Sequence, residues 1–132
     1  MITLTLNKGL QFIAKDELNH EIIVDTEKEF GGFDQGIHPI EYLLVALGGC
    51  MGMDIVGILR KKGGKIDNFE ITVNGKRANE HPKAYEKIVM TINCQGDYKR
   101  EDLLRSFELS RDKYCGAYAT LKKGPVIEFV VK

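Results

Sequence analysis

Two cysteines, Cys50 and Cys115, are the residues of this chain whose type and surroundings best suit chemistry. Cys50 follows an apolar run and two glycines, and Cys115 lies 65 positions later, between Tyr114 and Gly116. A thiolate is a strong nucleophile, and a second thiol can close a disulfide with an oxidised first one. A cysteine on an apolar helix with a distant partner cysteine therefore indicates a two-thiol redox centre.

The other groups that could do chemistry have simpler interpretations. Cysteine is among the most buried residue types, and Cys94, which lies in a strand-like run, is expected to be inert. Asp54 lies four residues after Cys50 on the same helix face, where a carboxylate would raise the thiol pKa. We expect Asp54 to be a structural hydrogen-bonding residue. His38 with the cysteines fits no known ligand spacing, so we expect no metal site.

Composition restricts the class of protein. The chain has 132 residues, a single-domain length, and we expect one domain over residues 1–132. Lysine plus arginine equals aspartate plus glutamate, at 19 each, so the net charge is zero. Such a chain has no field to attract nucleic acid or an anionic membrane, and we expect neither partner and no cofactor.

The cysteine count and the start of the chain indicate a reducing, cytoplasmic setting. Three cysteines are an odd number and too few for a secreted disulfide scaffold, and the first residues show no cleavage pattern. Eleven uncharged residues run from Leu43 to Met53, after which Asp54 and Arg60 interrupt. This run is too short to span a bilayer, so it predicts a core helix rather than a membrane helix.

The first part of the chain alternates between apolar and polar residues as strands do. Residues 2–6 and 10–14 predict two strands joined by a turn at Asn7–Gly9, and residues 20–24 predict a third. Together these segments predict an antiparallel meander. Residues 27–38 contain three glycines and no periodicity, so we expect a loop that could shape a binding site.

A buried helix is predicted to begin at Pro39, which suits the first helical position, with Glu41 in the first turn. From Tyr42 to Leu59 nearly every residue is apolar or glycine, which predicts burial on almost all sides. Four glycines in a helix are costly, so something is expected to pack close to this backbone. The expected neighbour is another helix or another subunit.

The rest of the chain predicts four more elements. Residues 69–74 and 85–94 read as strands, residues 100–111 as an amphipathic helix, and residues 126–131 as a last strand after Gly124-Pro125. The predicted order is three strands, a buried helix, two strands, a second helix and one strand. This is an α+β arrangement.

The stretch from Pro39 to Cys50, with Cys115 in a Tyr-Cys-Gly-Ala context, resembles the OsmC/Ohr family of thiol-dependent hydroperoxide reductases. The likeness covers essentially the whole chain and is strongest to the OsmC-like branch whose helix begins with proline, an apolar residue and glutamate. It implies an intertwined homodimer, with the apolar helices packed centrally and two active sites at the interface.

The resemblance also implies roles for individual residues. Cys50 would be the peroxidatic thiol, which attacks a hydroperoxide and becomes a sulfenic acid, and Cys115 would be the resolving thiol. A thiol or dithiol reductant would reopen their disulfide. The apolar surroundings would favour organic peroxides. Glu41 is the third catalytic candidate, as the acid of the helix start.

Two departures from the family pattern leave an alternative open. The peroxidases place an arginine in the early loop, whereas this chain has none before Arg60, and its helix-start glutamate comes one place later, at Glu41. A regular helix would separate Glu41 from Cys50 by about 13 Å, so Glu41 would act only through a kink or another segment. Lys8 or Lys15 could replace the arginine. The alternative is a dimer that binds a small apolar or thiol-reactive ligand with little turnover.

Overall fold

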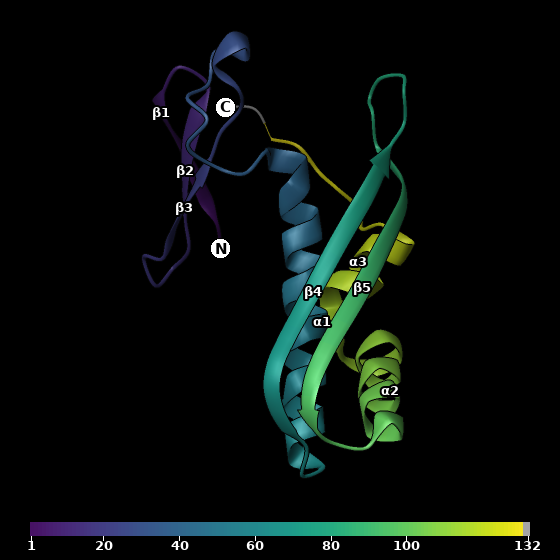
Figure 1. Ribbon diagram of the computed structural model, residues 1–132. Helices are drawn as coiled ribbons and strands as arrows, with labels where there is room; N and C mark the ends of the chain where they lie inside the picture. The colour runs from purple at the N-terminus through teal and green to yellow at the C-terminus, as the bar shows by residue number, and fades with distance from the viewer. Residues whose placement is uncertain (131–132) are drawn as a thin grey trace. The chain divides into compact units, whose positions relative to one another are not determined.

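The computed structural model describes residues 1–130, which form two compact units (Figure 1). The first comprises Met1–Leu43 and the second begins at Leu44. Each unit contains one antiparallel sheet. The antiparallel α+β class predicted from the sequence is therefore confirmed, while a single domain over residues 1–132 stays a prediction.

The first unit contains the predicted three-stranded meander. Its strands are β1 (Thr3–Lys8), β2 (Gln11–Lys15) and β3 (Glu21–Val24), and β2 pairs with both neighbours. The first turn lies later than predicted, because β1 continues to Lys8 and the chain reverses at Gly9, whose φ of +51° suits glycine. The order of these strands and their pairing are as the alternation predicts.

A buried carboxylate, Asp25, holds the loop that follows β3. One of its oxygens accepts hydrogen bonds from the backbone N–H groups of Thr26 and Phe33, at 2.9 and 3.1 Å. The other accepts from the Gln11 side chain and the Gln35 backbone, at 2.8 and 3.1 Å. Four donors satisfy this carboxylate, so the glycine-containing loop is fixed by hydrogen bonds as well as by apolar contacts.

These hydrogen bonds make the stability of the first unit sensitive to acid. Burial raises the pKa of Asp25, but the hydrogen bonds from Gln11, Thr26, Gln35 and Phe33 outweigh burial and lower the pKa to about 2. A carboxyl group with a lowered folded-state pKa stabilises the fold above its unfolded pKa, and this contribution is lost as pH falls towards the folded value.

We therefore expect wild-type stability to decline from about pH 4 to about pH 2 as Asp25 takes up its proton. Asp25→Asn cannot accept all four hydrogen bonds and should lower the melting temperature at neutral pH. The variant should also lose less stability than wild type on acidification. Melting curves measured by circular dichroism at a series of pH values test this, and equal pH dependence in the two proteins would contradict it.

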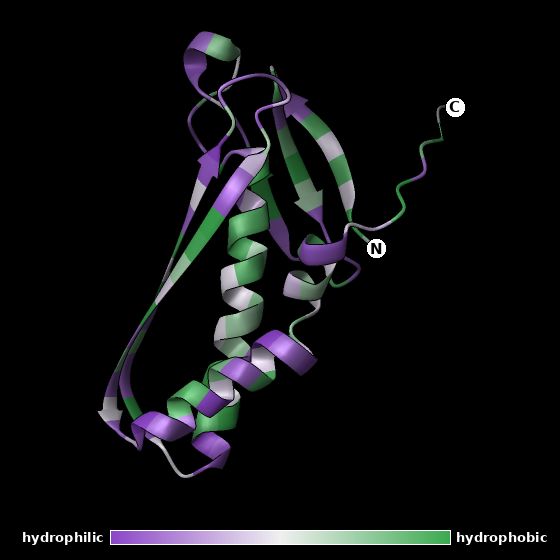
Figure 2. Ribbon diagram, turned by 90° about the vertical axis from the view of Figure 1, so that its right-hand side faces the viewer, coloured by the Kyte–Doolittle hydropathy of each residue, from purple (hydrophilic) through white to green (hydrophobic). Residues whose placement is uncertain are grey.

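The long helix begins at the predicted place. A 3₁₀ turn at Pro39–Glu41 leads into α1 (Tyr42–Lys61), which is largely apolar in Figure 2. The prediction of burial on almost all sides is wrong for a single chain. Only one stripe is buried, while Val45 and Met53 are 51% and 79% exposed. The buried stripe repeats every four residues and consists of Leu47, Met51, Ile55 and Leu59.

By length and composition alone, residues 39–61 would be long and apolar enough to cross a membrane, although 22% of the scoring window is buried inside the protein. Leu47, Met51 and Ile55 pack with residues of the strands and helices that follow α1. These contacts favour the predicted core helix.

The second unit places α1 beside a long hairpin and three shorter helical segments (Figure 1). The hairpin consists of β4 (Lys65–Arg77) and β5 (Tyr85–Asp97), both longer than predicted. Next come α2 (Arg100–Leu109), a π-helical turn (Ser110–Tyr114) and α3 (Gly116–Lys123). The second predicted helix therefore exists, but the π turn and α3 follow it where the sequence predicted no separate elements.

Close packing against the α1 glycines has a different cause from the one predicted. A Cβ added at Gly48 would lie 2.9 Å from a Val73 methyl group, and one at Gly52 would lie 3.1 Å from Ile71. Both neighbours belong to β4, so these two glycines let a strand approach the helix, rather than another helix or subunit. Nothing described lies within 4 Å of the corresponding position at Gly49.

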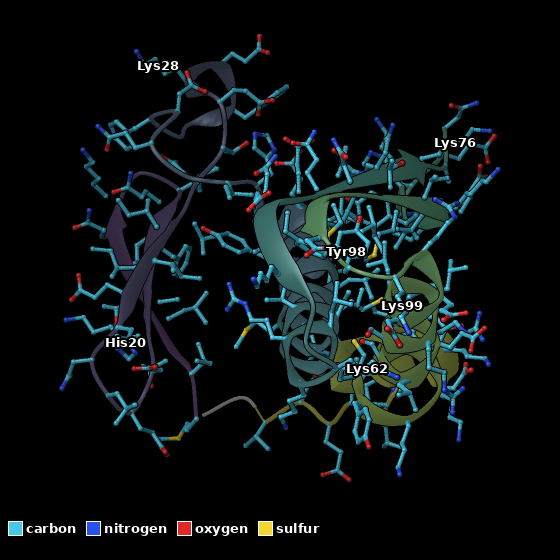
Figure 3. All side chains as sticks on the ribbon, turned by 60° about the horizontal axis from the view of Figure 1, so that its bottom comes forward. His20, Lys28, Lys62, Lys76, Tyr98 and Lys99 are labelled. Atoms are coloured by element: carbon cyan, nitrogen blue, oxygen red, sulfur yellow. The ribbon has the colours of Figure 1, made fainter. Side chains whose placement is uncertain are left out.

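The helix α2 is tied to the end of α1 by an ion pair. The Lys62 ammonium group donates a hydrogen bond of 3.1 Å to Asp102 (Figure 3). Asp102 lies in the first turn of α2, where a carboxylate also interacts favourably with the helix dipole. This contact fixes the start of the segment that leads to Cys115.

The predicted last strand does not form in residues 126–130, and Val131 lies outside the described residues. Val126 and Phe129 are 91% and 88% exposed. A strand needs a neighbouring backbone for its hydrogen bonds, and this segment has no strand partner among residues 1–130. Its apolar, β-branched composition therefore predicted a strand that this chain alone does not pair.

Candidate functional site

Cys50, Asp54 and Cys115 meet at the centre of the second unit. The two sulfurs and a carboxylate oxygen of Asp54 all lie within 4.8 Å of one another. Cys50 and Asp54 are one helical turn apart on α1, so their side chains share a face. The structure therefore brings together the two cysteines that the sequence singled out, and both are free thiols.

The π turn before Cys115 sets the position of its thiol. The Cys115 N–H donates a hydrogen bond to the Ser110 carbonyl, at 2.8 Å, which closes the turn. Cys115 then caps α3, and its sulfur accepts a hydrogen bond from the Tyr118 N–H at 3.3 Å. The sulfur therefore lies at the positive end of a helix, in the position that capping side chains normally occupy.

Asp54 is oriented by a buried hydroxyl group that the sequence gave no reason to select. The Ser110 side chain is fully buried and donates a hydrogen bond of 2.9 Å to one Asp54 oxygen. Asp54 is thus the hydrogen-bonding residue that the sequence predicted, but its carboxylate also lies against both thiols. The four-residue spacing from Cys50 was the available signal for Asp54, whereas Ser110 belongs to an unpredicted turn.

The two thiols have different surroundings. Burial raises the pKa of Cys115, and interactions with Cys50 raise it further, while N–H groups at the start of α3 lower it. Cys115 is 3% exposed, whereas Cys50 is only half-buried. Among residues 1–130, no arginine, lysine or histidine donates a hydrogen bond to either sulfur. Cys50 is therefore the more accessible thiol, and the N-terminal end of α3 supplies the hydrogen bond that Cys115 accepts.

An apolar cavity of about 510 Å³ lies beside the thiols. Leu47 and Met51, which flank Cys50 on α1, line it together with Phe107 and Tyr118. Arg111 also lines this cavity, but its guanidinium group donates two hydrogen bonds to Asp112, at 2.6 and 2.7 Å. The cavity offers room for a small, largely apolar molecule.

A second cavity, also of about 510 Å³, reaches the carboxylate side of the cluster. Its lining includes Asp54 and, from the same helix, Met53 and Gly57, and Leu109 and Tyr114 complete the opposite wall. Asp54 is half-buried, so its carboxylate is accessible from this cavity. The cluster can thus be approached from more than one direction.

The remaining candidates lie elsewhere. Glu41 belongs to the first unit, where its side chain is exposed on the 3₁₀ turn, and it is not part of the cluster. Lys8 lies over the Phe33 ring, 4.3 Å from its centroid, and Lys15 pairs with Glu21. Both lysines therefore have partners within the first unit, and their suggested role at the thiol stays a prediction.

Cys94 and His38 take no part in the cluster either. Cys94 lies on β5, where its carbonyl accepts a hydrogen bond of 2.7 Å from the Tyr98 hydroxyl. His38 lies 3.5 Å from a Glu27 oxygen in the first unit. These positions agree with the structural interpretations that the sequence favours for both residues.

Comparison with known proteins identifies the family pattern independently of the cysteines alone. The family model described as OsmC-like protein matches residues 32–130. Protein YhfA of Escherichia coli K12 is 30% identical over 117 residues, which cover 88% of this chain and 84% of the relative. The match therefore extends over nearly the whole length of both proteins.

Solved structures show the same fold. A hypothetical protein from Aquifex aeolicus superposes with a TM-score of 0.81 at 32% identity, covering 94% of this chain and 87% of the other. An organic hydroperoxide resistance protein from Elizabethkingia anophelis superposes with a TM-score of 0.64 at 16% identity, covering 93% and 86%. At that identity the second likeness shows the fold alone.

Proposed function

This chain belongs to the OsmC-like protein family, and from that premise we propose that it is a thiol-dependent reductase of organic hydroperoxides. The observation that carries the proposal is the approach of the Cys50 and Cys115 sulfurs to within 4.8 Å. Disulfide formation then needs only side-chain movement and a small backbone adjustment. Cys50, the more exposed thiol, is the peroxidatic residue, and the buried Cys115 is the resolving residue.

The proposed cycle balances without a cofactor. The Cys50 thiolate attacks the terminal oxygen of the hydroperoxide, the O–O bond breaks, and an alcohol leaves after taking up a proton. The Cys115 thiolate then attacks the Cys50 sulfenic acid, forming the disulfide and releasing water after protonation. A dithiol reductant restores both thiols and becomes a disulfide itself. The reducing cytoplasm is the setting that supplies such a reductant.

The cavity supports organic peroxides as the substrate class. Its walls next to Cys50 are the apolar side chains of Leu47, Met51 and Phe107. Apolar walls bind the carbon chain of an organic peroxide through the hydrophobic effect and give hydrogen peroxide no such contact. Resistance to oxidative stress would be the resulting role in the cell.

We also infer that the active protein is a homodimer. The face of α1 that includes Val45 and Gly49 borders a groove of about 430 Å³, and Val45 is half exposed. A mostly apolar helix with one buried stripe needs a further partner, and a second copy supplies one. Glu41 stays a catalytic candidate that reaches Cys50 through another segment, since nine helical residues separate them by about 13 Å. Sedimentation equilibrium should give twice the mass of one chain.

A second function is favoured by one observation at the thiols. No arginine, lysine or histidine among residues 1–130 donates a hydrogen bond to either sulfur, and Arg111 is paired with Asp112. Without a neighbouring cation, a thiol is less readily ionised. The alternative is a dimer that holds a small apolar or thiol-reactive ligand in the cavity and turns it over slowly.

Mass spectrometry of the intact chain distinguishes these functions. After one equivalent of an organic hydroperoxide, the reductase should lose two hydrogens per chain, and peptide mapping should place a disulfide between Cys50 and Cys115. Cys94→Ser should behave in the same way, because Cys94 lies outside the cluster. An unchanged mass, or a disulfide involving Cys94, would contradict the proposed cycle and favour the binding protein.

A further inference from the structure

We propose that Cys50, Asp54 and Cys115 form a binding site for a thiophilic divalent cation, with Zn²⁺ as the expected occupant. Two thiolates and one carboxylate are ligands that zinc commonly takes in proteins. Three protein ligands leave a fourth position for water or an external thiol. The sequence led us to expect no metal site, because the spacing between Cys50 and Cys115 matches no ligand motif. The fold creates the site by bringing two distant segments together.

The distances between the three donors suit tetrahedral coordination. With zinc–sulfur bonds of about 2.3 Å, two sulfurs of a tetrahedral site lie about 3.8 Å apart. The Cys50 and Cys115 sulfurs and the Asp54 oxygen already lie within 4.8 Å of one another. Rotation of the side chains by small amounts therefore closes the triangle around one ion. Cys50 and Asp54 share one face of α1, which fixes two of the three donors on a rigid element.

The charges of these groups also call for a cation. Each of the three donors is an anion when it loses its proton, and like charges at this separation repel one another. Among residues 1–130, no cationic side chain hydrogen-bonds the two sulfurs, and Asp54 accepts its hydrogen bond from neutral Ser110. A divalent ion would neutralise charges that the described residues leave uncompensated.

Ser110 gives the site an outer layer of support. Its buried hydroxyl group donates to one Asp54 oxygen, at 2.9 Å, and leaves the carboxylate with further acceptor capacity. Its carbonyl accepts the Cys115 N–H, at 2.8 Å. One residue therefore orients two of the three proposed ligands, as the hydrogen-bonding partners of metal ligands generally do. The cavity lined by Asp54 provides a path of entry for the ion.

Metal binding and peroxide reduction would compete for the same sulfurs. A coordinated Cys50 thiolate shares its electron pair with the metal and is blocked as a nucleophile, whereas the disulfide form has no thiolate to offer. The ion would bind the reduced protein and be excluded from the oxidised one. Binding requires no peroxide, so the metal site stands or falls independently of the proposed reductase.

The test is a titration of the reduced full-length protein, after removal of the reductant, with Zn²⁺ by calorimetry and with Cd²⁺ by ultraviolet thiolate-to-metal absorption. We expect one equivalent per chain and release of thiol protons on binding. Cys94→Ser is the matched control and should bind as wild type does. Cys50→Ser and Cys115→Ser should each lose the thiolate absorption by about half and weaken binding strongly.

Asp54→Asn tests the third ligand, because it keeps the size of the side chain and a group for Ser110 to donate to. We expect it to weaken binding at least about tenfold while retaining the thiolate absorption. Wild type oxidised to the disulfide should bind no ion and requires no substitution. Binding that is equal in Cys115→Ser, in the disulfide form or in Asp54→Asn would overturn the three-ligand site, as would the absence of stoichiometric binding in wild type.

Discussion

Replacement of Cys50 by serine should lower the consumption of organic hydroperoxide by about 10³-fold or more, because it removes the nucleophile itself. Serine is nearly the same size, and Cys50 is only half-buried, so the fold should persist. Cys115→Ser should behave differently. It keeps the peroxidatic thiol and should react with one equivalent of peroxide, then stop or slow sharply because no resolving thiol closes the disulfide.

The measurement is peroxide consumption with a dithiol reductant in excess, run beside a single-turnover experiment without reductant. Cys94→Ser serves as the matched control, since this thiol lies on β5 outside the cluster, and it should retain wild-type rates. Metal ions are removed from every sample, so that coordination of the thiols does not mask the comparison. Equal consumption by wild type and Cys50→Ser would eliminate the reductase.

Leu59→Ala should destabilise the protein by about 3 to 5 kcal/mol, within the range seen for fully buried leucines. Leu59 is 0% exposed and is the last member of the α1 stripe. Its side chain packs against Gly64, where an added Cβ would lie only 2.9 Å from it. Truncation leaves a cavity under this turn that a rigid helix end cannot refill. The site residues lie elsewhere on α1, so the change reports on packing.

Leu18→Ala is the matched control, because it makes the same truncation at a leucine that is 76% exposed. It should change the free energy of unfolding by less than about 0.5 kcal/mol. Urea denaturation followed by circular dichroism measures both, at one protein concentration because a dimer's stability depends on it. A loss for Leu59→Ala no larger than that for Leu18→Ala would contradict the assigned core.

The sequence was sufficient for the features that depend on local patterns. Alternation predicted the strands of the first unit, Pro39 marked the start of the long helix, and the two cysteine contexts pointed to the pair that the fold brings together. Each of these signals comes from short-range backbone preferences or from residue chemistry. They therefore survive without knowledge of tertiary contacts.

The features that depend on tertiary context were predicted poorly. Residues 126–130 have strand composition but no pairing partner within the described chain, and burial around α1 was overestimated because one chain covers only one stripe. Asp54 was selected by its spacing from Cys50, yet its contact with Cys115 depends on a segment 56 residues later, at Ser110. Such pairings are decided by packing rather than by composition.

The π turn at Ser110–Tyr114 has a consequence for the length of this segment. A π turn holds one residue more than an α-helical turn, and it survives only while tertiary contacts compensate for its poorer geometry. Deleting one residue there would let the backbone return to regular α-helix and would rotate everything after it by about 100°. Cys115 would then leave the cluster although its side chain had not been changed. The spacing between Ser110 and Cys115 is therefore as constrained as the cysteine itself, and an intact Tyr-Cys-Gly-Ala sequence after a shortened turn would not guarantee a working pair.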